Sequence, residues 1–492
     1  MLRALGFVPS GDPLLNNDGT ITITAGSNVT LNFSMTTAFE IKNETQLDTA
    51  IGAANTSSKE EIFMIGNDFS ISTSPMYNIG PGQNVTIITD GGDRKITRNG
   101  ASGDMITVGM GTLNLGKVGS GGKLTIDGGG AASSGSIVHS AGTLTMNDGV
   151  VLTNNVTSMP NGGGVFINNG SFTMNGGEIK NNKINSSGGG GGVYIAGGGS
   201  FTMYGGKITG NEVTAMSGDA NGGGVYIASG ANPFVMSGGV IENNRAISNG
   251  GGSTLAFGGG VYTAVGFTMR DNARISGNGA INYSPSSSDK SFGGGVGVDN
   301  GDFYMLGGSI DKNFAEVKDL GAAYGGGLSV GSGLLATMSG GVIKENHAIG
   351  SASPSGSAVG GGVYTESSFS MSNNAQVLLN TAEGYSSAQG GGISLAASGA
   401  LNMANDAKIS GNIVNGGTSA AQGGGVYCTA SNSINLSCTA PCITDNDAIA
   451  SVPTNASGGG VILNGATTTP AGLVGGFVTG NRSTGSYQDI AP

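Results

Sequence analysis

Two pairs of closely spaced carboxylates are the side chains that could act together on one substrate. Asp90 precedes Asp93 by three residues, and Asp445 precedes Asp447 by two. Hydrolysis of a glycosidic bond requires two carboxyl groups that face one site, so such pairs would indicate a carbohydrate-active enzyme. The first pair lies in a predicted turn, the second flanks an asparagine of a repeated column, and neither has a histidine nearby in the sequence. We therefore predict no catalytic residues.

Sulfur chemistry is confined to three cysteines late in the chain, Cys428, Cys438 and Cys442. We interpret them as small buried hydrophobic side chains, among which one local disulfide with a free thiol left over can form. A metal site needs further ligands, and both histidines, His139 and His347, are distant in the sequence. No phosphate-binding loop or dinucleotide fingerprint occurs in strict form, so we expect neither a metal nor a cofactor.

Aromatic side chains recur where they could hold a ligand. The candidate ligand-binding residues are five tyrosines: Tyr194, Tyr226, Tyr262, Tyr283 and Tyr324. The first three continue a column that begins at Phe166 and lapses at Gly297 and Ser329, whereas the last two lie in connections of variable length. Aromatic faces can hold sugar rings, but rings on neighbouring repeats can also stack on each other and only stabilise the fold.

These residues lie on a repeat that must position them. A Gly-Gly-Gly triplet followed by an apolar residue begins at Gly162, Gly190, Gly222, Gly258, Gly293, Gly325, Gly360, Gly390, Gly423 and Gly458. The steps between these starts run from 28 to 36 residues. A period in this range is typical of a solenoid, in which each repeat contacts only its neighbours.

Each repeat contains three short apolar segments separated by glycine. In the second repeat they are Val193–Ile195, Phe201–Met203 and Lys207–Thr209. Their side chains alternate between apolar and polar, which is the pattern of a strand with one buried face. The sequence therefore predicts an all-β fold, a right-handed parallel β-helix solenoid with three short strands per coil and coils about 4.8 Å apart.

Two columns keep their register through the repeats. An inward methionine recurs, as at Met203, Met236 and Met269, and an asparagine follows the third strand. The asparagines form the predicted structural ladder: Asn182, Asn211, Asn244, Asn278, Asn313, Asn346, Asn380, Asn412, Asn446 and Asn481. Asparagine tolerates the left-handed backbone of a sharp corner, and stacked amides can bond from coil to coil. Val151 and Asn154 are predicted to be an earlier member of this pattern.

Three regions follow from the pattern. Residues 1–60 are predicted to form N-terminal strands, at Thr20–Thr24 and Val29–Phe33, and an amphipathic helix over residues 44–54 that caps the first coil. Residues 61–161 are predicted to be irregular coils, and residues 162–492 the regular repeats. An exposed last coil would present unpaired strand edges for self-association.

Composition restricts the partners. Glycine accounts for 97 of 492 residues and the formal net charge is −11, which disfavours nucleic acid and anionic membranes as partners. No apolar run approaches the ~18 residues that span a bilayer. Met1–Ser10 is too short and too weakly apolar to indicate a secretory signal peptide.

The repeat resembles a known family. The segment Gly190–Val193, followed by Ile208 and Asn211, is similar to the GGA-I and FxxN repeats of polymorphic outer membrane proteins. It also resembles the wider group of bacterial and archaeal adhesin-like right-handed parallel β-helix proteins. The likeness covers Gly162 to Asn481, although isoleucine or valine stands where the family has phenylalanine. The resemblance implies display at the cell surface and a role in adhesion, and it transfers no ligand residues.

The sequence thus favours a non-catalytic extracellular or cell-surface scaffold or adhesin, which assembles end to end through its last coil and meets a surface glycan or protein. The alternative is a carbohydrate-active enzyme of the polysaccharide lyase or hydrolase type, or a carbohydrate-binding module.

Overall fold

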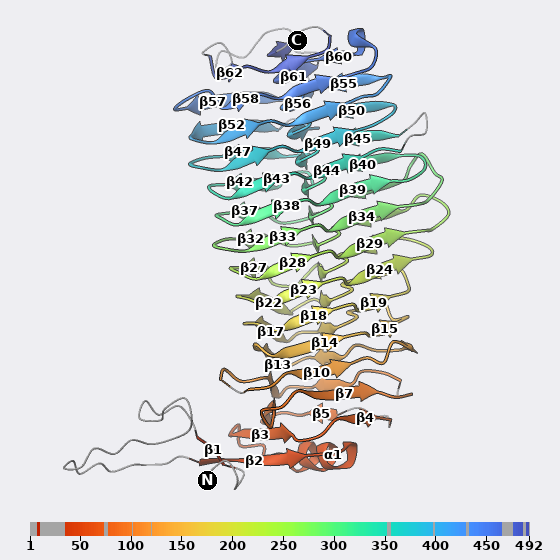
Figure 1. The fold of residues 1–492 in the computed structure, drawn as a ribbon, viewed down its shortest axis with the longest axis vertical. Coiled ribbons are helices and arrows are strands. Elements are labelled where there is room, and N and C mark those ends of the chain that lie inside the picture. The colour runs from red at the N-terminus through yellow and green to blue at the C-terminus, as the bar shows by residue number, and fades with distance from the viewer. Residues whose placement is uncertain are drawn as a thin grey trace, which may run out of the picture.

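The computed structural model is a stack of coils that runs from β2 (Met35–Ile41) at one end to β61 (Val461–Asn464) near the other (Figure 1). It describes residues 7–9, 35–72, 77–100, 102–119, 121–351, 356–396, 399–429, 432–464, 476–485 and 489–491. The fold is the predicted all-β right-handed parallel solenoid. The strands predicted at Thr20–Thr24 and Val29–Phe33 lie outside the described residues.

A regular coil contains five short strands, the three predicted and two more. In one coil they are β21 (Val193–Ile195), β22 (Ser200–Met203), β23 (Lys207–Thr209), β24 (Glu212–Ala215) and β25 (Ala220–Asn221). Each pairs in parallel with its equivalent in the next coil and so builds one sheet. We number the sheets I to V in this order. Among the described residues they contain 14, 15, 14, 12 and 9 strands.

Sheets I to III enclose the main hydrophobic core. Sheet I runs from β5 (Tyr77–Ile79) to β64 (Ile490–Ala491), sheet II from β1 (Phe7–Pro9) to β57 (Ser433–Cys438), and sheet III from β4 (Phe69–Ile71) to β62 (Val478–Thr479). Met203, Met236 and Met269 lie in register and are fully buried, as predicted. Phe201 and Phe234 stack beside them with ring centroids 4.7 Å apart.

Sheets IV and V form a thin flange beside the main core. Sheet IV runs from β11 (Ala132–Ser133) to β63 (Arg482–Ser483), and sheet V from β20 (Gly188–Gly189) to β60 (Ala456–Ser457). Their inner faces meet through small side chains such as Ala315, Ala323, Ala348 and Ala358, which form a cluster of their own. Alanine and glycine give little periodic apolar signal, which explains why the sequence did not predict these two sheets.

The asparagine ladder lies at the neck, where sheet III passes into sheet IV. Within it, the backbone N–H and the Nδ2 of Asn244 both donate to Oδ1 of Asn278 at 2.9 Å, and its Nδ2 also donates to the carbonyl of Ile208 at 2.9 Å. All ten predicted asparagines belong to this ladder and are buried. At the C-terminal side the Oδ1 of Asp489 accepts the two bonds from Asn481.

Two details of the ladder correct the prediction. Its first member is Asn155, not Asn154, because Leu152 rather than Val151 pairs with Ile179 of the next coil. Val151 and Leu152 are both apolar, and an asparagine follows each of them three residues later. The sequence therefore allows either register. The left-handed backbone belongs to the residue before each ladder asparagine, as at Asn154 with a φ of 58°. The asparagines themselves contribute amide bonds to the corner.

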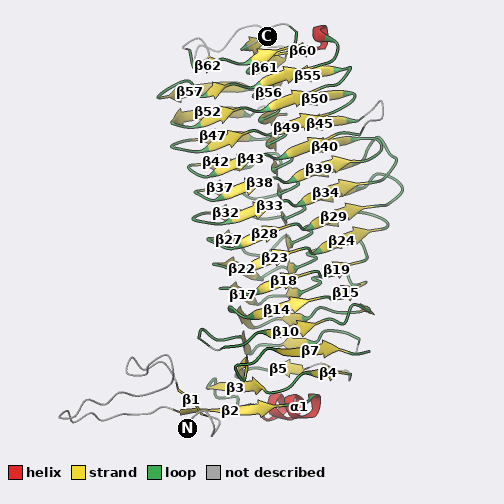
Figure 2. Cartoon of the chain, viewed as in Figure 1, coloured by secondary structure: helices red, strands yellow, loops and turns green. Residues whose placement is uncertain are grey.

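A helix covers the first coil, as predicted. Helix α1 (Glu44–Ala53) begins after Asn43, whose side chain accepts a hydrogen bond from the backbone N–H of Gln46 at 2.9 Å. Leu47 and Ile51 are buried against the end of the main core. Figure 2 shows this helix at the end of the stack, opposite the short 3-10 helix η2 (Pro453–Asn455).

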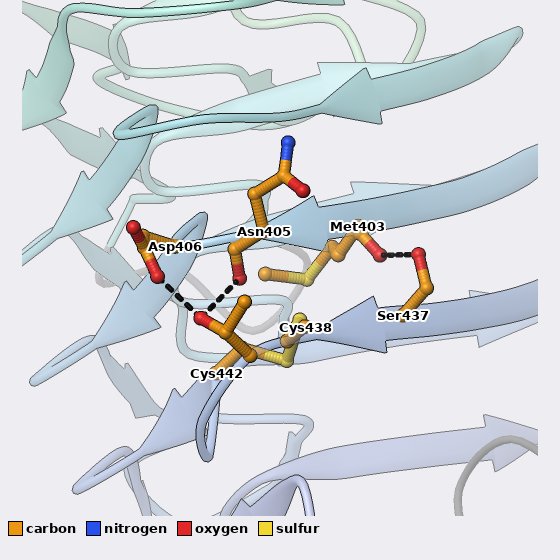
Figure 3. The surroundings of a disulfide bond; sticks show 7 residues. Met403, Asn405, Asp406, Ser437, Cys438 and Cys442 are labelled. Atoms are coloured by element: carbon orange, nitrogen blue, oxygen red, sulfur yellow. Dashed lines mark hydrogen bonds between the residues drawn. A yellow bond between two sulfur atoms is a disulfide. The ribbon is translucent and has the colours of Figure 1, made fainter.

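A disulfide joins Cys438 and Cys442 at the corner between sheets II and III, and Cys428 is a buried free thiol. All three cysteines are buried, and the local disulfide that the sequence left open is present. In Figure 3 the disulfide lies beside Asn405 and Asp406 of the neighbouring coil, and the hydroxyl of Thr439 donates to both residues.

Reduction of this disulfide is expected to weaken the corner and leave the stack folded. A cross-link that closes so short a loop is worth about 2 kcal/mol in the chain-entropy account. Hydrogen exchange with and without reductant should therefore accelerate at Ser433–Cys438 and remain unchanged at Phe201–Met203. Faster exchange throughout the chain would contradict a local role.

Candidate functional site

Three of the predicted tyrosines lie in one line on the outer face of sheet I. Tyr194 on β21, Tyr226 on β26 (Val225–Ile227) and Tyr262 on β31 (Val261–Thr263) occupy paired positions of successive coils. The ring centroids are 4.7 Å apart for the first pair and 5.1 Å apart for the second. The column starts earlier, where His139 stacks on Phe166 at 4.5 Å.

Where this column lapses, sheet V supplies the rings. Phe257 contacts Tyr262 and stacks on Phe292, which stacks in turn on Tyr324, with centroids 4.9 and 4.8 Å apart for the two stacked pairs. The line then returns to sheet I, where the ring centroid of Tyr364 lies 4.7 Å from that of Tyr324. We call these nine side chains the aromatic row: His139, Phe166, Tyr194, Tyr226, Tyr262, Phe257, Phe292, Tyr324 and Tyr364.

The structure thus brings together four of the five predicted tyrosines. Tyr283 lies apart in the connection after β34 (Gly279–Asn282), with 48% of its surface exposed. In the row each ring lies against a neighbour, and two hydroxyls near its later end are engaged. That of Tyr262 donates to Asp299 at 3.2 Å, and that of Tyr364 donates to Glu366 at 2.9 Å. This geometry supplies cross-strand stabilisation, and ligand binding by these tyrosines stays a prediction.

The aromatic row is expected to lower the folding stability of the chain at alkaline pH. Burial, with the nearby Tyr194 and Asp299, raises the pKa of Tyr226 to about 12 from an ordinary value of 10.0. The unfolded phenol therefore ionises first, and folding stability falls as the pH rises from 10 towards 12. Replacing Tyr226 with phenylalanine should reduce this loss, as measured by urea denaturation at a series of pH values. An unchanged pH profile would contradict the raised pKa.

A pocket of about 470 Å³ opens on the outer face of sheet IV, and the sequence did not predict it. It crosses β39 (Phe314–Val317), β44 (His347–Ile349), β49 (Thr381–Glu383) and β54 (Ile413–Asn415). Its lining includes Glu316, Lys318, His347, Ile349, Glu383, Tyr385 and Asn415. The pocket depends on the register of sheet IV, which has no periodic apolar signal in the sequence.

One of the two carboxylates in this pocket has a cationic partner. The ammonium of Lys318 contacts the carboxylate of Glu316, whose side chain is 16% exposed. His347 Nε2 lies 3.4 Å from Glu383 Oε2, and the Glu383 side chain is 53% exposed. Burial lowers the pKa of His347, an effect that the two glutamates partly offset, so the imidazole is neutral at pH 7. Glu383 is then the carboxylate most accessible to a ligand.

No protein-family model, curated protein or solved structure matches this chain. The similarity to polymorphic outer membrane proteins therefore remains a resemblance of motifs, and the solenoid that it implied is observed.

Three of the four carboxylates in the two predicted pairs have structural partners. Asp90 forms an ion pair with Arg94 at 2.6 Å, and Asp93 accepts a hydrogen bond from the backbone N–H of Lys123 at 2.9 Å. In the second pair, both oxygens of Asp447 accept from Arg482, at 2.8 and 2.7 Å.

In the described part of the chain, no three histidine, cysteine or acidic side chains come together as a metal site. No helix in those same residues has the length and apolarity to cross a membrane.

Proposed function

We propose that this chain is a non-catalytic scaffold that works outside the cell as an adhesin. The observation that carries the proposal is the disulfide between Cys438 and Cys442, because such bonds persist chiefly in oxidising, extracytoplasmic environments. The stacked coils add a long, rigid surface on which side chains from successive coils align. This surface suits contact with a cell-surface glycan or protein. The net charge of −11 disfavours nucleic acid.

The non-catalytic part of the proposal rests on how the acidic side chains are used. Asp90 and Asp447 are held by arginines, and Asp127 and Asp311 form ion pairs with Lys95 and Arg274. Such partners fix a carboxylate in its ionised form and leave it poorly suited to donate a proton to a leaving group.

Exposure at the surface of the source cells tests this proposal. We expect protease added to intact cells to degrade the chain, and alkylation before lysis to find Cys438 and Cys442 oxidised. Beads coated with the purified chain should adhere to target cells more than beads coated with a heat-unfolded sample. Protection from protease together with reduced cysteines would contradict an extracellular role, and equal adhesion of the two bead samples would contradict the adhesin role.

End-to-end association is a separate part of the proposal. Strand β62 (Val478–Thr479) is the last described strand of sheet III, and an unpaired strand edge is a template for another chain. Sedimentation velocity of the wild type should show concentration-dependent fibres, and Val478→Pro should abolish them with the fold preserved. A monomeric wild type would contradict this part alone.

A carbohydrate-binding module is the second candidate, and the pocket on sheet IV favours it. Glu316 and Glu383 lie two coils apart in one column, with Ile349 between them. The exposed Tyr385 lies at the same pocket.

A further inference from the structure

We propose that the pocket on sheet IV binds one or two residues of a neutral saccharide. The inference deepens the proposed function, since it names the ligand class that an extracellular adhesin would recognise. It assigns that ligand to Glu383, Tyr385 and their neighbours and not to the aromatic row. A scaffold could act without this pocket, so the two proposals can fail separately.

Strand register gives the pocket its spacing. Glu316, Ile349, Glu383 and Asn415 occupy paired positions on four successive strands of sheet IV. Parallel strands lie about 4.8 Å apart, so the backbones of Glu316 and Glu383 are separated by roughly 10 Å. Polar groups at this separation can accept hydrogen bonds from hydroxyls at opposite edges of a sugar ring, while the apolar face of the ring lies over Ile349.

The rim of the pocket adds an aromatic ring, which can contact the apolar face of a sugar. Tyr385 is 42% exposed and follows Glu383 by two residues, at the rim of the pocket. Unlike the rings of the aromatic row, Tyr385 has no aromatic neighbour among the described contacts. An exposed aromatic ring beside a few polar groups is the usual composition of a small-molecule site, and it matches the mixed apolar and hydroxyl-bearing surface of a sugar.

Charge argues against other ligand classes. Glu316 already has the ammonium of Lys318, and His347 is neutral at pH 7, so the pocket carries a net charge near −1 from Glu383. A phosphate or another anion would be repelled by Glu383. A basic peptide would find a single accessible carboxylate, which is too little for strong charge-based binding. A neutral, hydroxyl-rich ligand uses the same carboxylate as a hydrogen-bond acceptor.

The experiment measures binding of four neutral disaccharides, cellobiose, maltose, lactose and N-acetylchitobiose, to the full chain by titration calorimetry. We expect at least one to bind in the millimolar range or tighter. Tyr385→Ala and Glu383→Gln should each weaken that binding at least tenfold. Tyr204→Ala removes an exposed tyrosine at a distant corner, and should leave binding unchanged. Circular dichroism of each variant should match the wild type, since both pocket residues are exposed.

Three outcomes would overturn the inference. The first is that none of the four disaccharides binds, and the second is that Tyr385→Ala and Glu383→Gln bind as well as the wild type. The third is that a hexalysine peptide binds at this pocket and the sugars do not. Each would leave the cell-surface and adhesion tests of the proposed function unaffected. Conversely, sugar binding by a chain that remains inside the cell would support the pocket and contradict the adhesin.

Discussion

Replacing Asn278 with alanine should lower the free energy of unfolding by about 3–9 kcal/mol. The Asn278 side chain is fully buried, and its Oδ1 accepts bonds from both the backbone N–H and the Nδ2 of Asn244. Its own Nδ2 donates to Ile241 and Asn313. Alanine would leave two donors and one carbonyl buried without partners, and each such group costs about 1–3 kcal/mol.

A matched control separates burial from amide chemistry. Asn435 on sheet II also bonds to an asparagine of an adjacent coil, here the preceding one, with its Nδ2 at 2.8 Å from Asn402 Oδ1, but it is exposed. Asn435→Ala should change stability by less than about 0.5 kcal/mol, since water replaces the lost partner.

The measurement combines denaturant unfolding with hydrogen exchange at the amide of Asn244, because a solenoid can unfold in parts. Equal shifts in the two variants would show that the ladder contributes no more than a surface pair.

Much of this fold could be predicted because the strands of sheets I to III alternate between buried apolar residues and outward polar ones. Residues such as Ile195, Met203 and Ile208 recur at fixed positions and are all buried. The flange follows a different rule, in which Ala315 or Ala358 packs closely because it is small. Small side chains are common in loops as well as in thin sandwiches, so composition could not distinguish the two.

The candidate sites show a second limit of reading columns from a sequence. Tyr226 and Tyr262 were found because they occupy one column, but Phe292 and Tyr324 continue the row from another sheet. Gly297 and Ser329 therefore look like gaps in the sequence, although rings from sheet V take over the row at those coils. The pocket could not be predicted for a similar reason. Glu316 and Glu383 are aligned only by the register of sheet IV, which the sequence does not indicate.

The glycine triplet and the ladder asparagine of each repeat lie against each other at the neck. The third glycine of each triplet faces the amide of a ladder asparagine. A Cβ at Gly260 would lie 2.9 Å from Asn278 Nδ2 and 2.7 Å from the carbonyl oxygen of Gly295, closer than real Cβ atoms approach other atoms. The glycine triplets are therefore needed for the same reason as the asparagines: the chain segments on either side of the neck must come close enough for the ladder to be enclosed.

Gly260→Ala should accordingly destabilise the chain by about 3 kcal/mol, the upper end of the usual cost of overpacking, because neither contacted group can move without breaking coil-to-coil hydrogen bonds. Gly251→Ala is the matched control, since a Cβ there would meet nothing within 4 Å. That change should be neutral or stabilise by up to about 1 kcal/mol through the unfolded chain. Urea denaturation of both variants checks the difference. A Gly260→Ala variant as stable as Gly251→Ala would mean that the neck can widen, and that the ladder does not depend on the glycines opposite it.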